Sequence, residues 1–243
     1  MARMIGYSCS IRLPWLNKAV QLLEENLTAA EYKEKMNEYL GFEIDGPTRL
    51  RKTREILMHV WYYPTEELED ARKEALDLMK KYPEYDAAIH YMMICLTYPV
   101  FADICTIMGK FFEYQDEVTN AALKKKLFDD WGERGALDTT TRRVTLTLKE
   151  LGILKSEVKT KYALQKIDVP KEDVVDFILA RGMQLDGRSY YSYTELGKLY
   201  VLFPFNYVVS KEMIARQDRY LVTGFGGEPT FALKRDTIDN GNP

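Results

Sequence analysis

Five side chains that could hold a phosphate group fall on one predicted helix in the middle of the chain. Arg142, Arg143 and Lys149 carry positive charge, and Thr139 and Thr145 carry hydroxyl groups that can donate hydrogen bonds. Together with the free N–H groups of a helix's first turn, such side chains bind phosphate oxygens. The pattern predicts contacts with the backbone of a nucleic acid.

The stretch around this helix, residues 122–169, has the order of a winged helix-turn-helix. A lysine-rich helix is followed by a turn with two glycines. A second helix is predicted to begin at Asp138 or Thr139, whose side-chain oxygen would accept hydrogen bonds from free N–H groups. It is predicted to end before Gly152, which suits the left-handed conformation after a helix. Residues 153–169 are predicted to fold back as a two-stranded hairpin, the wing.

Leu146 interrupts the polar face of this predicted helix, because it lies between Arg142 and Lys149. Such a leucine can meet a thymine methyl group, pack under the wing, or mark a contact with another protein. An amphipathic helix with two arginines can also be an ordinary solvated helix, and a winged helix can serve only to dock proteins. The sequence leaves these alternatives open.

A second group of cations opens another predicted helix, which follows Pro47: Arg49, Arg51, Lys52 and Arg54. The second half of this helix is apolar on most sides, so we expect the basic end to protrude. With the helix before it, it forms a second unit like a helix-turn-helix, with a longer turn. The alternative is a solvated helix end whose cations pair with nearby acids such as Glu43 and Asp45.

Residues that could support catalysis or bind a metal form no recognisable constellation. Cys9, Cys95 and Cys105 lack metal-ligand spacing, and His59 and His90 are each expected to be hydrogen-bonded core residues. The glycine-rich stretch GFGGEP lacks the GxxxxGK[ST] pattern of a phosphate-binding loop. We therefore expect a non-enzymatic protein without a cofactor or a metal.

The charge distribution agrees with a nucleic-acid surface in one part of the chain. The 243 residues carry a net charge of −3, yet residues 119–169 hold 11 Lys/Arg against 7 Asp/Glu. A local excess of this size fits a few phosphate contacts, or binding aided by partners or several copies. The N-terminus lacks the apolar core of a signal peptide, and three cysteines suit a reducing compartment, so we expect a cytoplasmic protein.

The pattern of elements predicts a mainly α fold, a helical bundle with helix-turn-helix units that include a winged helix, plus a small α+β C-terminal region. Residues 87–112 are apolar, but Pro99 and polar residues interrupt them, so we interpret them as two core helices and not as a membrane span. Four units are predicted: an N-terminal helix-turn-helix-like unit (1–63), a helical core (64–115), the winged helix-turn-helix (116–169) and a C-terminal appendage (170–243).

The C-terminal appendage is marked by aromatic residues between positions 183 and 210. Exposed tyrosines there could stack on bases or form a protein interface, although we expect many of them to fill a core. Residues 219–234 are predicted to form two short strands joined by a glycine-rich turn. The tail, residues 236–243, is expected to be disordered.

Four stretches resemble the BrxA family of bacteriophage-exclusion (BREX) defence systems: YSCSIRLPWLNKAVQLL, TRLRKTREI, IHYMMICLTYPVFADICTIM and LDTTTRRVTLTLKELGILKS. The resemblance covers residues 7–160. It implies a small, mostly helical, non-enzymatic DNA-binding protein of the cytoplasm, with a bundle similar to an antitermination factor. It also implies that the protein works beside a methyltransferase and large ATPase components. The positions that it implies face DNA are Arg142, Arg143 and Lys149, and also Arg49, Arg51, Lys52 and Arg54.

We therefore expect a binder of double-stranded DNA that serves phage defence, with other BREX subunits as further partners and no association with a membrane. Two other functions remain open. The chain could be an adaptor that docks other subunits of a defence complex, or its helical bundle could bind RNA. The sequence does not fix a DNA sequence preference or an oligomeric state.

Overall fold

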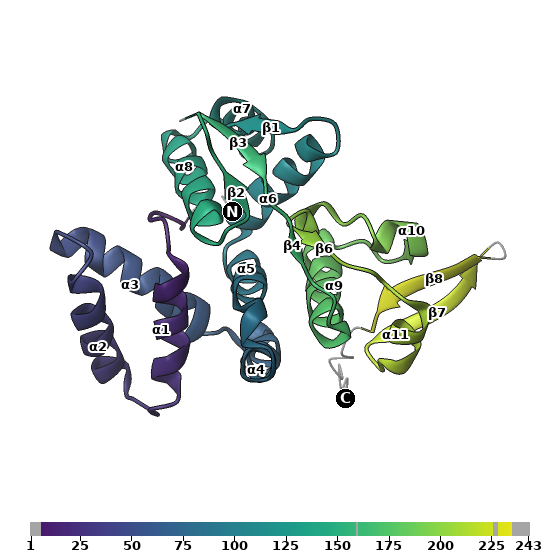
Figure 1. Cartoon of the computed structure of the whole chain (residues 1–243), viewed down its shortest axis with the longest axis horizontal. Coiled ribbons are helices and arrows are strands. Elements are labelled where there is room, and N and C mark those ends of the chain that lie inside the picture. Colours follow the sequence, from purple (N-terminus) through teal and green to yellow (C-terminus); the bar gives the residue numbers. More distant parts are fainter. Residues whose placement is uncertain (1–5, 159, 226–227, 235–243) are drawn as a thin grey trace, which may run out of the picture.

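The computed structural model describes residues 6–158, 160–225 and 228–234, and most of them are helical (Figure 1). The first part contains the helices α1 (Leu13–Leu23), α2 (Ala29–Gly41), α3 (Pro47–Trp61), α4 (Glu66–Lys81), η1 (Pro83–Tyr85), α5 (Asp86–Thr97) and α6 (Pro99–Phe112). The middle contains β1 (Glu117–Thr119), α7 (Asn120–Trp131), α8 (Gly135–Glu150), β2 (Leu154–Lys155) and β3 (Lys161–Leu164). The last part contains β4 (Ile167–Asp168), α9 (Glu172–Asp186), β5 (Tyr191–Ser192), α10 (Tyr193–Leu196), η2 (Tyr200–Leu202), β6 (Phe205–Asn206), α11 (Lys211–Arg216), β7 (Tyr220–Phe225) and β8 (Glu228–Leu233). The prediction of a mainly α fold is thus confirmed.

Three groups of elements surround the central helices α4, α5 and α6. In Figure 1, α1 to α3 lie on one side, α7 and α8 with the sheet of β1 to β3 at the top, and α9 to β8 on the other side. One continuous cluster of buried side chains, from Tyr7 to Phe231, runs through all of these groups.

A sharp bend at Pro99 separates the two most apolar helices, α5 and α6. α5 ends at Thr97 and α6 begins at Pro99, because a proline disfavours helical geometry in the residue before it. The segments Pro83–Thr97 and Pro99–Phe112 are bent by 118°, and no single helix in the described ranges is long and apolar enough to cross a bilayer. The prediction of two core helices that meet at this proline is confirmed.

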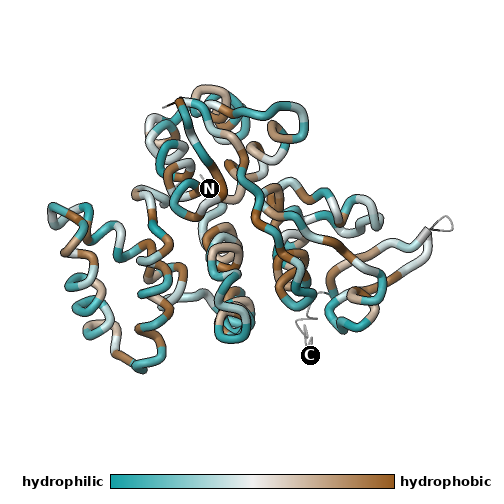
Figure 2. Tube along the Cα trace, viewed as in Figure 1, coloured by the Kyte–Doolittle hydropathy of each residue, from teal (hydrophilic) through white to brown (hydrophobic). Residues whose placement is uncertain are grey.

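The N-terminal group follows its local sequence signals. Pro14 lies in the first turn of α1, and Thr28 and Glu31 form the capping box that begins α2. The trace in Figure 2 alternates between polar and apolar residues along these outer helices, because each buries one face. Tyr32, Met36 and Leu40 form that buried face on α2.

The middle segment has the order strand, two helices, two strands. β1, β3 and β2 form one antiparallel sheet in that spatial order, with Val118 opposite Tyr162 and Leu154 opposite Leu164. The hairpin predicted over residues 153–169 is present in β2 and β3, but the end of that stretch forms β4, which pairs with β6 instead. The third strand of the sheet, β1, is an addition that we did not predict. Gly152 has a φ of +75°, as expected for the residue that ends a helix.

The C-terminal group packs on the central helices α5 and α6, through α9 and η2 respectively. β7 and β8 form the predicted antiparallel pair, and β5 extends their sheet. Some aromatic residues of this group are buried and others are exposed, as expected: Tyr191 is buried whereas Tyr190 is exposed. The predicted disordered tail, residues 236–243, lies outside the described residues.

The two histidines differ from each other. His90 is fully buried, and its Nε2 atom lies 2.7 Å from Oδ1 of Asn17, which confirms a hydrogen-bonded core residue. His59 is exposed on α3, so the prediction that it is a core residue was wrong. Its neighbour Trp61 takes the buried position at the end of that helix.

Candidate nucleic-acid interface

The N-terminal segment fixes one face of α8. The hydroxyl of Thr140 donates to the carbonyl of Tyr7 at 3.2 Å, and the hydroxyl of Thr147 accepts from the backbone N–H of Ile11 at 2.9 Å. Leu137, Val144 and Leu148 bury the adjoining face of the helix. α8 is therefore held on two sides, and the rest of its circumference is open to solvent.

The open side of α8 carries the α8 stripe, which consists of Thr139, Arg142, Leu146 and Lys149. All four side chains are exposed, and Leu146 is 40% exposed. At about 100° per residue, these four positions cover an arc of roughly 80° on the helix. One narrow strip thus presents a hydroxyl group, two cations and one apolar side chain.

Asp138 lies beside the stripe and pairs with two cations. Its carboxylate is 3.1 Å from Arg142, one turn later in α8, and 3.3 Å from Lys124 of α7. The Arg142 side chain nevertheless remains 66% exposed. A pair with this exposure contributes little stability, so it leaves the guanidinium able to exchange Asp138 for another anion.

Arg143 lies at the border of the stripe and is half-buried. Its Nε atom is buried and has no hydrogen-bond partner within the described part of the chain. A buried N–H donor without a partner is unfavourable, so this side chain gains if a ligand provides an acceptor.

Two expectations about α8 need correction. The helix begins at Gly135 with Arg134 as the N-cap residue, and not at Asp138 or Thr139. Arg142 and Arg143 therefore lie two turns inside the helix, away from the free N–H groups of the first turn. Thr145 is fully buried and its hydroxyl donates to the carbonyl of Arg142 at 3.0 Å, so it does not face a ligand on this surface.

The cations of α3 also divide into two kinds. Arg49, Arg51 and Lys52 are exposed, as predicted for a protruding helix end. The side chain of Arg54 is only 13% exposed, and it donates to Asn37 at 2.8 Å and to Glu55 at 2.6 Å. Arg54 therefore joins α3 to α2, and its prediction as a DNA contact is corrected.

The alternative for α3, pairing of its cations with nearby acids such as Glu43 and Asp45, holds for Arg54, which pairs with Glu55 of its own helix. Glu43 pairs with Arg12, whose Nε atom also lies 3.1 Å from Glu150 at the end of α8. Arg12 therefore joins the loop before α3 to the C-terminal end of α8.

The sequence analysis missed the N-terminal segment as a support of α8. Tyr7 and Ile11 contact Thr140 and Thr147, which are more than 130 residues away in the chain, so no local pattern indicates the contact. The pair of Asp138 with Arg142 could have been found, because the two residues are four apart on one helix.

The structure offers little for metal chemistry. Across the residues that are described, no group of three or more His, Cys, Asp or Glu side chains is arranged to hold a metal ion. The pKa of buried His90 is lowered to about 3 by desolvation, so this ring stays neutral near pH 7.

Comparisons with protein-family models, with curated proteins and with solved structures found no match for this chain.

Proposed function

We propose that this chain is a non-enzymatic protein that binds double-stranded DNA, with α7 and α8 as the helices and β2 and β3 as the wing of a winged helix-turn-helix. In this proposal α8 is the recognition helix, because it carries exposed cations and is followed directly by the hairpin. Arg142, Arg143, Lys149 and Thr139 contact the phosphate backbone.

The observation that carries the proposal is the division of α8 into a fixed side and an open side. The side that contacts the N-terminal segment and the core is closed to any ligand. The α8 stripe on the other side has Arg142 and Lys149 on either side of Leu146. A helix with this division can lie against a groove with cations next to both phosphate strands.

The α3 helix supplies a second set of exposed cations, Arg49, Arg51 and Lys52, and Arg49 is the member nearest its start. In the proposal these cations add electrostatic attraction without base recognition. Because the chain as a whole is acidic, attraction to DNA depends on these local groups.

We place this DNA-binding protein in a phage-defence system of the BREX type, on the resemblance of residues 7–160 to the BrxA family. Other subunits of such a system are then its protein partners, and the cytoplasm is its compartment. The resemblance includes the stretch LDTTTRRVTLTLKELGILKS, which forms most of α8 and the turn after it.

A second candidate is a protein adaptor, which the exposure of Leu146 favours. A leucine at the centre of an exposed strip is also what a partner protein would bury. In this case α8 docks a subunit of the defence complex in place of DNA.

Equilibrium binding of a fluorescent duplex to the purified full chain, with structured RNA and unlabelled duplex as competitors, tests the proposal. We expect unlabelled duplex to displace the probe at lower concentration than RNA. Preferred displacement by RNA, or no duplex binding at about 50 mM salt, where phosphate contacts are strong, would contradict it. Capture of partner subunits that survives nuclease treatment, combined with absent duplex binding, would establish the adaptor instead.

A further inference from the structure

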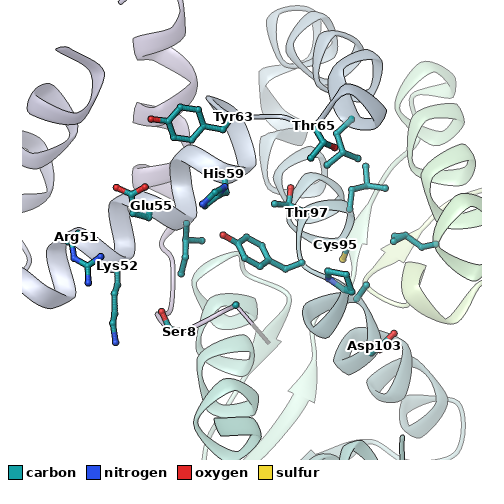
Figure 3. Close-up of a pocket in the computed structure, with 18 residues that line it drawn as sticks. Ser8, Arg51, Lys52, Glu55, His59, Tyr63, Thr65, Cys95, Thr97 and Asp103 are labelled. Atoms are coloured by element: carbon teal, nitrogen blue, oxygen red, sulfur yellow. The ribbon is translucent and has the colours of Figure 1, made fainter. Parts of the chain in front are cut away.

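A cleft of about 900 Å³ opens between α3 and the elbow at which α5 meets α6 (Figure 3). Small-molecule sites have volumes of about 300–1,000 Å³ and are common at the junctions between structural units. The described residues that line the cleft come from the N-terminal segment, α3, the start of α4, α5, α6 and α9, and none of them belongs to α8. The cleft is therefore separate from the α8 stripe.

One wall of the cleft is a row of side chains on α3. Arg51 and Lys52 come first, Glu55 follows about one turn later, and His59 follows one turn after that. Residues four apart share a helix face, and Figure 3 shows this order along α3. From Arg51 to His59 the row is roughly 12 Å long at 1.5 Å per residue. Cations, a hydrogen-bond acceptor and a flat ring thus follow one another in line.

The charges in the cleft favour an anion at the Arg51 end. Arg51 and Lys52 are exposed and form no ion pair within the described ranges. The two acids are engaged elsewhere, since Oε1 of Glu55 accepts from Arg54 at 2.6 Å and Oδ2 of Asp103 accepts from the indole N–H of Trp131 at 2.9 Å. The cations are therefore the groups that remain available for a ligand.

The opposite wall is mostly apolar. Leu96, Tyr98, Pro99 and Ala102 line it, and Thr97 faces His59 across the cleft in Figure 3. An exposed imidazole opposite an apolar wall makes a slot for a flat aromatic ring, because bases stack on such rings regardless of their sequence. Arg54 occupies Oε1 of Glu55, and the other carboxylate oxygen, Oε2, can accept from an exocyclic amino group of a base in this slot.

We infer that this cleft binds a nucleotide, with its phosphates on Arg51 and Lys52, the amino edge of its base toward Glu55, and the base against His59. This assignment gives Arg51 and Lys52 a small ligand in addition to the attraction that they exert on DNA in the proposed function. It also explains why His59 is exposed although it stands in the apolar half of α3.

Isothermal titration of the full chain with ATP, UTP, adenosine and tripolyphosphate tests the inference. We expect ATP to bind more tightly than UTP, which lacks an exocyclic amino group. We also expect ATP to bind at least about ten times more tightly than adenosine, which lacks the charged contacts, or tripolyphosphate, which lacks the stacking contact.

Variants locate the site. The double variant Arg51→Ala/Lys52→Ala should lower the affinity for ATP by about tenfold or more, because two charge-assisted contacts are lost. His59→Ala should lower the affinities for ATP and for adenosine but leave the affinity for tripolyphosphate unchanged. The matched control Lys73→Ala/Lys80→Ala removes two cations of α4 outside the cleft and should leave ATP binding as it is. The absence of ATP binding at about 1 mM, or equal ATP affinity in the folded double variant, would overturn the inference.

Discussion

The hydroxyl oxygens of Tyr7 and Thr147 lie 2.7 Å apart, although 140 residues separate them in the sequence. Oγ1 of Thr147 also donates to the carbonyl of Arg143 at 3.0 Å and accepts from the N–H of Ile11 at 2.9 Å. Because Thr147 has one hydroxyl proton, which goes to Arg143, Tyr7 is the donor in the first contact. This buried network fixes the N-terminal segment to α8 and determines which side of α8 faces solvent.

Thr147→Val is expected to lower the free energy of unfolding by about 3 kcal/mol, because it leaves two buried donors, on Tyr7 and Ile11, without an acceptor. Urea unfolding measures the change. Thr147→Ser keeps the hydroxyl and should lose only about 1 kcal/mol for the missing methyl group. Equal stability of the valine and serine variants would show that the network does not hold the segment.

Protonation of His90 should make stability depend on pH. Asn17 donates its amide N–H to Asp86 at 2.7 Å, so its Oδ1 accepts from Nε2 of His90, and Nδ1 carries the lone pair. The pKa of His90 is lowered to about 3 in the folded chain, against 6.5 for an ordinary histidine. The stabilisation is thus complete above pH 6.5 and is lost as the pH falls toward 3, because the unfolded chain binds the proton first.

Urea unfolding at pH 7.5 and pH 5 checks this dependence. We expect a loss of about 2 kcal/mol from His90, since each pH unit below 6.5 contributes about 1.4 kcal/mol. His90→Gln should reduce the difference in the free energy of unfolding between the two pH values by that amount. If the free energy of unfolding of His90→Gln differs between the two pH values as much as that of the parent, His90 titrates normally in the folded chain.

Gly109 allows η2 to approach α6. A Cβ atom at this position would lie 2.1 Å from the carbonyl oxygen of Tyr200, so the backbone must shift to accept one. Gly109→Ala is expected to cost about 3 kcal/mol, measured by urea unfolding, because the clash is with main chain in a packed core. A Cβ atom at Gly135, at the start of α8, would meet no described atom within 4 Å, so Gly135→Ala should be neutral or slightly stabilising. Similar stability of the two variants would contradict the close approach.

Leu146 distinguishes the two candidate functions. Leu146→Glu introduces a negative charge between Arg142 and Lys149, and it should weaken duplex binding by about tenfold or more through repulsion of phosphates. Leu146→Gln has a similar size without the charge and should have a much smaller effect. Fluorescence anisotropy with a labelled duplex measures both variants. If both leave duplex affinity intact but abolish capture of a partner subunit, the stripe is a protein interface.

The helices could be predicted because their signals are local. The capping box of Thr28 with Glu31, the break at Pro99 and the left-handed Gly152 all act within a few residues. The start of α8 was misplaced because Asp138 and Thr139 have the chemistry of N-cap residues, yet Arg134 and Gly135 already have the backbone conformation that begins the helix.

The site was harder to predict because exposure depends on distant segments. Thr145 belongs to the polar residues of α8 but is buried against the body of the protein, and Arg54 is held by Asn37, which lies 17 residues earlier on α2. The cleft beside α3 combines residues from Gly6 to Leu185, so no single stretch of sequence contains it.

The salt dependence of duplex binding tests the central claim most directly. The affinity of the full chain for one duplex is measured from about 50 to 200 mM salt for the parent, for Arg142→Ala/Arg143→Ala, and for the control Lys73→Ala/Lys80→Ala. The account predicts that the α8 double variant binds more weakly and that its plot of log affinity against log salt is shallower by about 2, one for each lost phosphate contact, while the control matches the parent. A slope and an affinity equal to those of the parent in the α8 variant would contradict the account.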